Sequence, residues 1–489
     1  MIEGWLERSI KKYKKMRDKF VKINKNLWEL PKDHFSFMRV PARLYGTEKI
    51  LNQTEDRALK QLINITSLPG IVRHGVAMPD IHSGYGPPIG GVGATLADSG
   101  VISPGFVGFD ENCGVRLLTS DSHIDDIKDY LDPVAEKIFN TVPSGVGQGQ
   151  EKAMNMKDIE NVLDRGAEWL VEQGYGKEED IKLSEAGGNL VSDHEKISKR
   201  AKKRGLDQVG TLGSGNHFIE IQVVDKIYDN QKAEVFGLEK GQVVVMIHTG
   251  SRGLGHQNCK DFLNRAKKST KKNNYKLPDK NLNCFPFNSQ EGRDFFLGLG
   301  GACNFSFANR QMITHLVRKA WTETLSGDLN LLYDVAHNTA KLEKHEVDGE
   351  EKKLVVHRKG ATRAFPPGHK SLPVKYKETG QPVIMPGSMG TCSYILSGLR
   401  SGKSSFYSTA HGAGRKMSRT AARKNISDKS LFDLLKSRNI ILKSRSKRGV
   451  TEEAPGAYKD INEIVDVVSD SGLAKKVAKV KPLAVIKGE

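Results

Sequence analysis

Apolar residues recur with helical spacing in several separate stretches of the chain. Residues 1–28 carry apolar side chains on or near one face of a basic segment, and this pattern predicts an amphipathic N-terminal helix. Residues 291–325 form the longest such stretch and contain the small residues of GLGGAC. Shorter helices are predicted over residues 56–66, 124–140, 157–174, 192–204, 414–425, 429–437 and 459–469.

Alternating or continuous apolar runs mark the predicted strands. HFIEIQVVDKI (217–227) and GQVVVMIHTGSRG (241–253) are two such runs, and residues 352–364 and 382–396 are also typical of strands. Between residues 69 and 114 the helical period is lost and Gly and Pro dominate, which predicts loops and short strands. We expect an α+β fold with mixed or antiparallel sheets, flanked by helices and carrying the functional site at their loop ends.

No repeat period and no low-complexity linker interrupts the chain, and polar motifs extend from residue 80 to residue 487. This distribution favours one interwoven domain over residues 1–489 rather than a series of independent modules. The basic helix at residues 1–28 would be an appendage to that domain. Residues 442–458, in the basic stretch LKSRSKRGVTEEAPGAYKD, are the candidate for a mobile loop.

The charge balance of the chain points to a polyanionic partner. Lys and Arg number 76 against 58 Asp and Glu, which gives a net charge of +18. So basic a chain most often binds nucleic acid, although a soluble protein can also be basic without doing so.

Cysteine usage and the lack of long apolar runs bear on the compartment. Five cysteines at wide spacings, with no CxxC pair, indicate a reducing environment. No run of about 18 apolar residues is present, and the N-terminal segment lacks the apolar core of a signal peptide. We therefore expect a cytoplasmic protein with no membrane span.

Several metal-ligand residue types lie where apolar runs give way to loops, a context typical of functional residues. The histidines of this kind are His217, His248, His337 and His411. Asp110 and Cys113 are three apart in the Gly-flanked turn GFDENCGVR, so a carboxylate and a thiolate can converge. With three imidazoles they suit Zn²⁺, Mn²⁺, Fe²⁺ or Co²⁺, or two ions bridged by the thiolate. The alternative is a buried structural cysteine beside an unrelated carboxylate.

Three Gly-rich loops offer clustered backbone N–H groups to an anion: TLGSGN (211–216), PGSMGT (386–391) and HGAGR (411–415). Each loop could equally be an ordinary tight turn. HGAGR leads directly into the basic, helix-like segment RKMSRTAARK. We therefore expect a helix N-terminus that attracts phosphate at this point, with Arg415 as a bidentate clamp.

A fourth Gly-rich segment is excluded as a nucleotide-binding motif. Gly402-Lys403-Ser404 resembles the end of a P-loop, but Ser397 occupies the position of the required upstream glycine. The chain is therefore not expected to be a P-loop ATPase or GTPase.

Seven motifs, in order along the chain, resemble those of the RtcB family of RNA ligases. They are FDENCGVR, GTLGSGNHFIE, HTGSRGLG, YDVAHN, MPGSMGT, STAHGAGR and the terminal VKPLAVIKG, and the upstream PDIHSGYGPPIGG is similar to the family's first Gly-rich block. The resemblance covers nearly the whole chain and implies a fold unlike the Rossmann and P-loop folds. It implies an enzyme that joins RNA ending in a 2′,3′-cyclic phosphate or 3′-phosphate to RNA with a 5′-hydroxyl, in tRNA splicing or RNA repair.

The resemblance also implies GTP as cosubstrate and two Mn²⁺ ions per subunit. One Mn²⁺ would be held by Asp110, Cys113 and His217. The second would be held by Cys113, His248 and His337, with the thiolate as a bridge. The implied partners are RNA ends, tRNA halves among them, and an archease-type activator, and we expect a monomer.

In this resemblance His411 would be the nucleophile that carries GMP as a phosphoramidate. The guanylate pocket would comprise Asn216, His217, Phe218, Ile219, Glu220, His337, Asn338, Pro386, Gly387, Ser388, Met389, Ser393, His411, Gly412, Ala413, Gly414, Tyr458 and Lys487. Tyr458 would pack on guanine, and Glu220 would accept from its ring N–H groups. Asp80 and Arg415 fall where RNA or phosphate contacts would be expected.

Two other interpretations stay open on the sequence. A di-metal phosphoesterase would open RNA 2′,3′-cyclic phosphates without ligation, but it would need neither a guanylate carrier at His411 nor Lys487. A basic RNA-binding module would leave the Cys/His/Asp set unexplained, and aromatic residues are only 7% of the chain. The basic segments 263–276 and 436–448 are either solvated faces or an RNA backbone footprint.

Overall fold

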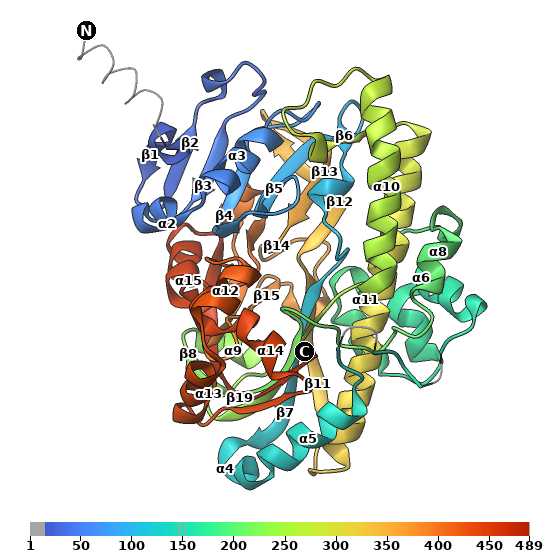
Figure 1. Ribbon diagram of the computed structural model, residues 1–489, viewed down its shortest axis with the longest axis vertical. Coiled ribbons are helices and arrows are strands. Elements are labelled where there is room, and N and C mark those ends of the chain that lie inside the picture. The colour runs from blue at the N-terminus through green and yellow to red at the C-terminus, as the bar shows by residue number, and fades with distance from the viewer. Residues whose placement is uncertain (1–14, 146–147, 152, 489) are drawn as a thin grey trace.

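The computed structural model describes residues 15–145, 148–151 and 153–488. Its strands form two large sheets, the first in the upper half of Figure 1 and the second in the lower half. The first sheet has the spatial order β1 (Val21–Asn24), β2 (Leu27–Leu30), β3 (Ala42–Tyr45), β4 (Gly75–His82), β5 (Ile89–Leu96), β13 (Glu350–Lys359) and β12 (Asn338–Val347). Only the β3–β4 pair in this sheet is parallel.

The second sheet carries most of the predicted site residues. Its spatial order is β11 (Leu329–Ala336), β7 (Gly114–His123), β9 (Gln242–Thr249), β8 (Phe218–Ile227), β19 (Ala474–Lys487), β16 (Ser393–Gly398) and β15 (Pro382–Met385), with β18 (Ile441–Ser444) parallel to β19. All other neighbours are antiparallel. Two small sheets pair β6 (Val101–Ile102) with β10 (Phe285–Pro286), and β14 (Ala361–Arg363) with β17 (Ser408–Ala410). A Rossmann sheet is mostly parallel, so the predicted α+β class is confirmed.

The two large sheets share a hydrophobic core. Val76 and Val92 of the first sheet lie in one buried cluster with Val383 and Leu396 of the second. Apolar residues of α15 (Ile461–Asp470) belong to the same cluster. Burial of this kind holds the two sheets together and fixes the loops between them.

Helices cover the outside of the sheets. The two longest, α10 (Arg252–Lys272) and α11 (Gln290–Thr322), lie side by side along one edge of the molecule, with α6 and α8 packed outside them (Figure 1). Gly298 permits this close approach, because a Cβ at that position would lie 2.8 Å from the Phe262 ring. The other helices are α2 (Glu48–Gln53), α3 (Asp56–Ile65), α4 (Ile124–Ile127), α5 (Leu131–Thr141), α6 (Met156–Glu172), α7 (Glu178–Lys182), α8 (Lys199–Lys203), α9 (Asn230–Phe236), α12 (Arg419–Asn425), α13 (Asp428–Ser437) and α14 (Lys447–Val450).

Among the described residues, no helix combines the length and apolar character that a membrane crossing requires.

The predicted N-terminal helix over residues 1–28 is not formed by the residues that the structure describes. Residues 1–14 lie outside them, Met16–Lys19 is a 3₁₀ turn, and β1 and β2 form a hairpin. In β2 the burial alternates residue by residue, so that Trp28 and Leu30 face the core. The two-residue period of a strand therefore prevails over the helical spacing of this segment.

Other elements differ from the prediction at their boundaries. The helix predicted over 192–204 is split, because the Ser198 hydroxyl caps the backbone N–H of Ala201 and starts α8 at Lys199. The strand predicted over 241–253 ends at Thr249, and α10 follows it directly. The sequence did not predict α10, β12 or β19. Glycines at the start of α10 and its long charged end conceal the helical pattern.

Two predictions concern the C-terminal third. The predicted start of a helix at HGAGR is wrong, because α12 begins later, at Arg419, with Ser418 as its N-cap. Residues 442–458 contain part of β18, helix α14 and two 3₁₀ turns. The mobility of this segment stays a prediction, as does the single-domain organisation.

Candidate active site

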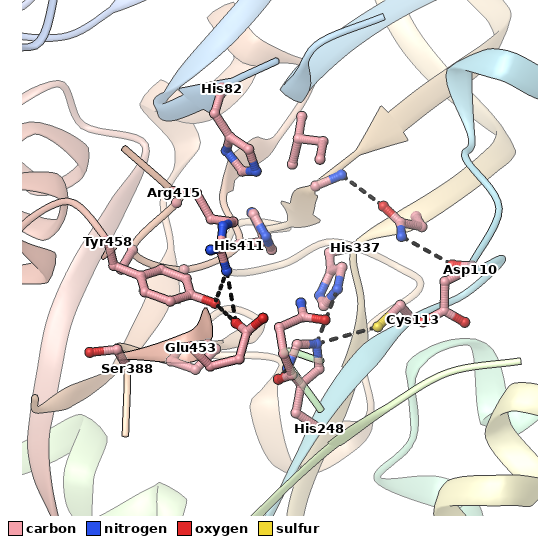
Figure 2. Close-up of a pocket in the computed structure, with 18 of the residues that line it drawn as sticks. His82, Asp110, Cys113, His248, His337, Ser388, His411, Arg415, Glu453 and Tyr458 are labelled. Carbon is pink, nitrogen blue, oxygen red and sulfur yellow. Dashed lines mark hydrogen bonds and ion pairs between the residues drawn. The ribbon is translucent and has the colours of Figure 1, made fainter. Parts of the chain in front are cut away.

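Most of the predicted site residues meet at a cavity of about 320 Å³ between the two sheets. Its walls combine segments from His82 near the N-terminus to Lys487 at the end of β19. Figure 2 shows His411 between two groups of side chains, with Tyr458, Arg415 and Glu453 to one side and the cluster around Cys113 to the other.

Four neighbouring strands of the second sheet present a Cys/His/Asp cluster at one edge. Cys113 directly precedes β7, His217 directly precedes β8, His248 lies near the end of β9, and His337 directly follows β11. The spatial order β11-β7-β9-β8 is antiparallel throughout, so these starts and ends lie at the same edge. Asp110 joins them from the turn before β7.

The ligand atoms of this cluster lie close together. The Cys113 Sγ is 3.5 Å from the His217 Nε2 and 3.3 Å from the His248 Nε2. The His248 and His337 Nε2 atoms are 3.4 Å apart, and the His217 Nε2 is 2.9 Å from the Asp110 Oδ2. These atoms form two groups, Asp110–Cys113–His217 and Cys113–His248–His337, and each group lies within 4.8 Å. Cys113 belongs to both.

Hydrogen bonds at the far side of two rings fix their tautomers. The His217 Nδ1 lies 3.0 Å from the carbonyl oxygen of Leu212, and the His248 Nδ1 lies 3.1 Å from that of Asn216. A carbonyl only accepts, so each Nδ1 carries the proton and each Nε2 turns a lone pair toward the cluster. Lone pairs that converge in this way repel each other unless a cation lies between them.

The charge state of the cluster also indicates that a cation binds there. Burial, reinforced by the Asp110 carboxylate, raises the pKa of the Cys113 thiol well above its usual value. Burial and the neighbouring imidazoles lower the pKa values of His248 and His337 well below theirs. A divalent cation would stabilise the thiolate and use the neutral imidazoles as ligands. The residues therefore fit a metal-binding centre.

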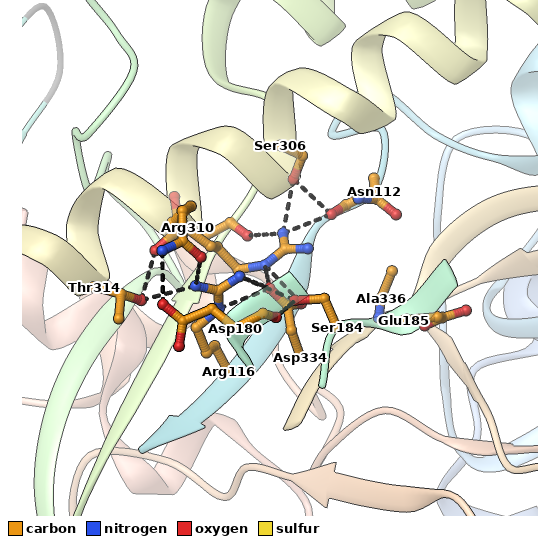
Figure 3. Close-up of polar contacts among 12 residues, drawn as sticks. Asn112, Arg116, Asp180, Ser184, Glu185, Ser306, Arg310, Thr314, Asp334 and Ala336 are labelled. Atoms are coloured by element: carbon orange, nitrogen blue, oxygen red, sulfur yellow. Dashed lines mark hydrogen bonds and ion pairs between the residues drawn. The ribbon is translucent and has the colours of Figure 1, made fainter. Parts of the chain in front are cut away.

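A buried polar network around Arg310 and Asp334 (Figure 3) holds two segments that carry the cluster, the turn before Cys113 and the end of β9. The Arg310 Nη1 in α11 donates to the carbonyl oxygens of Asn112, at 2.9 Å, and Thr249, at 3.1 Å. Asn112 precedes Cys113 and has a φ of 57°, and Thr249 follows His248. The Asp334 carboxylate pairs with both Arg310 and Arg116, and all three side chains are fully buried. Arg310 thus connects the turn before Cys113 and the end of β9 to helix α11.

His411 is held by a buried carboxylate. It follows β17, and its Nδ1 lies 2.6 Å from the Asp80 Oδ2, which also accepts from the His411 backbone N–H at 3.0 Å. The Nδ1 therefore carries a proton toward Asp80, and the Nε2 stays available to the cavity. The rings of His411 and His337 have centroids 4.9 Å apart. Asp80, expected at an RNA or phosphate contact, is instead fully buried and positions His411.

The wall opposite the metal-binding cluster contains an ion-paired arginine. The Arg415 Nη1 donates to the Glu453 Oε2 at 2.9 Å and to the Tyr458 hydroxyl at 3.2 Å. The Tyr458 hydroxyl in turn donates to Glu453. Arg415 lines the cavity, but its charge is already partnered and no helix begins beside it. The predicted helix N-terminus is therefore absent at Arg415, and a phosphate contact by this residue stays a prediction.

Most residues of the predicted guanylate pocket line the cavity. Those that do are Asn216, Phe218, Glu220, His337, Asn338, Pro386, Gly387, Ser388, Met389, His411, Gly412, Ala413, Gly414, Tyr458 and Lys487. Ile219 is buried in the hydrophobic core, and its neighbours Phe218 and Glu220 face the cavity from β8. Ser393 lies behind the wall, where its hydroxyl accepts from the Gly387 N–H at 3.1 Å. His217 belongs to the metal-binding cluster.

The cavity also contains residues that the sequence did not single out. They are His82, Tyr85, Ile89, Val107, Gly108, Phe109, Lys359, Gly360, Arg419 and Glu453. His82 and Tyr85 belong to the Gly-rich block PDIHSGYGPPIGG, so their neighbourhood was visible in the sequence. Lys359 and Glu453 lie in stretches without any motif, and only the fold brings them to the site.

Comparison with known proteins agrees with the geometry. A family model described as tRNA-splicing ligase RtcB matches residues 61–488. The tRNA-splicing ligase RtcB of Nanoarchaeum equitans is 50% identical over 479 residues, which cover 96% of this chain and 99% of the relative. That of Thermococcus kodakarensis is 47% identical over 475 residues, with 96% and 98% covered. The RNA-splicing ligase RtcB of Mycobacterium tuberculosis is 46% identical over 432 residues, with 88% and 100% covered. Since these matches extend over nearly its whole length, the chain belongs to the RtcB family.

Proposed function

We propose that the chain is a GTP-dependent RNA ligase that joins RNA 2′,3′-cyclic phosphate or 3′-phosphate ends to 5′-hydroxyl ends. RNA ligation is the activity that the names of the relatives state. The observation that carries the proposal is the position of His411. Its ring is oriented by Asp80 and lies beside a metal-binding cluster in a cavity large enough for a nucleotide.

The proposed metal centre holds two Mn²⁺ ions. Asp110, Cys113 and His217 would hold one ion, and Cys113, His248 and His337 the other. Carboxylate, thiolate and imidazole together suit a divalent ion of intermediate softness. When bound, the ions supply positive charge that neutralises phosphate oxygens and favours in-line displacement at phosphorus.

In the first proposed step the chain becomes guanylylated. The His411 Nε2 attacks the α-phosphorus of GTP, a P–N bond forms, and the bond to the leaving pyrophosphate breaks. The Nδ1 proton stays on the ring, so the guanylylated imidazole carries positive charge, which the Asp80 carboxylate stabilises at 2.6 Å. An imidazole is a suitable carrier because its phosphoramidate remains reactive.

Two further transfers complete ligation. Water first opens a 2′,3′-cyclic phosphate to the 3′-phosphate. An oxygen of that phosphate attacks the guanylyl phosphorus, the P–N bond breaks, and His411 regains its lone pair. The RNA 5′-hydroxyl then attacks the RNA 3′-phosphorus, loses its proton to a base, and GMP leaves. A phosphodiester between the two RNA strands remains.

The proposal is tested by incubating the native chain with GTP, Mn²⁺ and two short RNA strands, one ending in a 3′-phosphate or a 2′,3′-cyclic phosphate and the other beginning with a 5′-hydroxyl. We expect a joined product that depends on GTP. A cyclic-phosphate strand that is opened but never joined, with or without GTP, would contradict ligation and support the di-metal phosphoesterase. Analysis on a denaturing gel separates these outcomes.

Asp80→Asn is expected to slow guanylylation of His411 by roughly 10²–10⁴-fold, because the amide keeps the shape of the carboxylate but removes the charge that stabilises the modified imidazole. The rate of incorporation of radiolabelled GMP into the protein measures the effect. Manganese content serves as the control and should stay at the native value, since Asp80 belongs to neither ligand group. A rate within threefold of the native one would contradict the role given to Asp80.

We propose that Glu220 selects guanine over adenine. Its carboxyl group is buried in the cavity wall and accepts from the Gln222 side chain at 2.6 Å. Burial raises the pKa of Glu220 to about 8, although Gln222 and Lys487 act in the opposite direction. Guanine offers two adjacent N–H donors, and adenine has an acceptor at the corresponding ring position. A carboxylate at this site would therefore reject adenine by leaving polar groups unpaired.

Guanine binding at Glu220 should then depend on pH. The free protein holds a proton on Glu220 below about pH 8, and that proton must leave before the carboxylate can accept from guanine. The affinity for GMP is expected to rise roughly tenfold per pH unit up to about pH 8 and then level off. Calorimetric titration at pH 6.5 to 8.5 measures it. In Glu220→Gln the affinity should be lower and flat, and a native profile equally flat would exclude this role.

The family description points to tRNA halves as the RNA substrates, and we propose them on that ground. Assistance by an archease-type activator, a monomeric state and a cytoplasmic location remain predictions.

A further inference from the structure

Three aromatic rings form a continuous cluster next to the metal-binding centre. The centroids of Tyr85 and Phe109 are 5.2 Å apart with the rings inclined at 61°. Those of Phe109 and His256 are 4.9 Å apart with the rings inclined at 24°. Phe109 directly precedes Asp110, and Tyr85 and Phe109 both line the cavity. We call these three residues the aromatic cluster.

The aromatic cluster is open to solvent although its backbone is held firmly. Tyr85 is 43% exposed although it lines the cavity. Its carbonyl oxygen accepts from the buried ammonium group of Lys359, which also donates to the Gly105 carbonyl at 3.0 Å. The next residue, Gly86, has a φ of +71°, and a Cβ there would lie 2.8 Å from the Asn281 carbonyl oxygen. The Tyr85 loop is therefore fixed in place through its backbone.

Positive charge lies beside the exposed rings. Partial burial, together with the nearby Arg204 and Lys260, lowers the pKa of His256. Flat rings with cationic side chains next to them form the surface that single-stranded nucleic acid recognises. The bases stack on the rings and the phosphates lie near the cations.

The position of the aromatic cluster assigns it to RNA rather than to GTP. The predicted guanylate residues Tyr458 and Ser388 lie on the other side of His411 from Asp110 (Figure 2). Phe109 adjoins Asp110, so the aromatic cluster flanks the metal-binding side of the cavity. A nucleotide joined to an RNA chain needs an open approach, which the exposed Tyr85 side provides.

We propose that Tyr85, Phe109 and His256 form a stacking platform for a nucleobase at one of the two RNA ends that the enzyme joins. This inference rests on the proposed ligase function and adds a subsite to it. The base could belong to the strand with the 3′-phosphate or to the strand with the 5′-hydroxyl, because stacking does not distinguish them.

Tyr85→Ala tests the platform, with Tyr85→Trp as the conservative variant and Tyr130→Ala as the matched control. Tyr130 is 52% exposed and does not line the cavity. Guanylylation of His411 without RNA should be unchanged in all three. The KM for one RNA strand should rise roughly 5- to 150-fold in Tyr85→Ala, and Tyr85→Trp should restore it. Formation of guanylylated RNA reports on the 3′-phosphate strand, and sealing of preformed guanylylated RNA reports on the 5′-hydroxyl strand.

An abasic terminal nucleotide provides a second measurement that uses the native chain. Removing the base from the correct strand should raise KM about as much as Tyr85→Ala, and combining both changes should add little more. Unchanged KM values for both strands in Tyr85→Ala, or no effect of either abasic strand on the native chain, would overturn the platform. A native chain that fails to become guanylylated would instead overturn the proposed ligase function, so the two failures are distinguishable.

Discussion

His411→Ala is expected to abolish the covalent transfer of GMP to the protein, and with it all joining of 3′-phosphate RNA. The imidazoles of His217, His248 and His337 cannot replace it, because their Nε2 atoms are directed at the metal-binding cluster. The measurement uses GTP that is radiolabelled on the α-phosphate, with Mn²⁺, followed by a denaturing gel. The native chain should carry a label that acid removes, since a P–N bond to imidazole is acid-labile.

The control for this experiment is His315→Ala. His315 is a partly exposed histidine of α11 whose ring makes an edge-to-face contact with Tyr175 outside the cavity. It should retain the native label. A label that persists in His411→Ala would mean that another group carries the nucleotide, and the route through His411 would have to be abandoned.

Cys113→Ala is expected to remove both metal ions, because Cys113 is the one residue common to the two ligand groups found in the described part of the chain. His217→Ala and His337→Ala should each remove one ion and leave the other. The loss of the thiolate also leaves the second ligand group with only the neutral imidazoles of His248 and His337, and the first with Asp110 and His217. Guanylylation in Cys113→Ala should fall below detection.

Metal content after dialysis, measured by inductively coupled plasma mass spectrometry, tests this expectation independently of activity. The metal content is expected to be highest in the native chain, lower in the two histidine variants and lowest in Cys113→Ala. Cys303→Ala is the matched control, since Cys303 is a buried thiol in α11 that belongs to neither ligand group. Equal manganese content in Cys113→Ala and the native chain would rule out a bridging thiolate.

The candidate metal-binding residues could be singled out from the sequence because their signals are local, whereas their division into two ligand groups came from the resemblance to the RtcB family. Cys113 and Asp110 share one Gly-flanked turn, and each histidine stands at the end of an apolar run. The cluster then follows from the antiparallel order of four strands, which places those ends together. Candidate functional residues at strand ends can therefore be recognised in the sequence before the fold is known.

The supporting residues could not be predicted, because their roles depend on contacts between distant segments. Asp80 lies 331 positions from His411, and nothing near Asp80 in the sequence distinguishes a buried positioning carboxylate from a surface one. Arg310 occurs in a long helical stretch, where an arginine is normally expected to face solvent. The N-terminal hairpin was not predicted for a related reason. The apolar residues of this short basic segment fit both the helical and the strand period, and only packing against the core decides between them.

Arg310 has a consequence for how the enzyme acquires its metal. It donates to the main-chain carbonyl oxygens of Asn112 and Thr249 and not to the ligands themselves, and the buried Asp334 carboxylate balances its charge. The contacts of Arg310 in α11 therefore preorganise the metal-binding site before an ion binds. Metal ions then bind to and dissociate from a preformed site. In small zinc domains, by contrast, the ion is required for folding. A chain depleted of metal should keep its architecture and recover when ions return, and the ion that it carries should follow the supply in the cell.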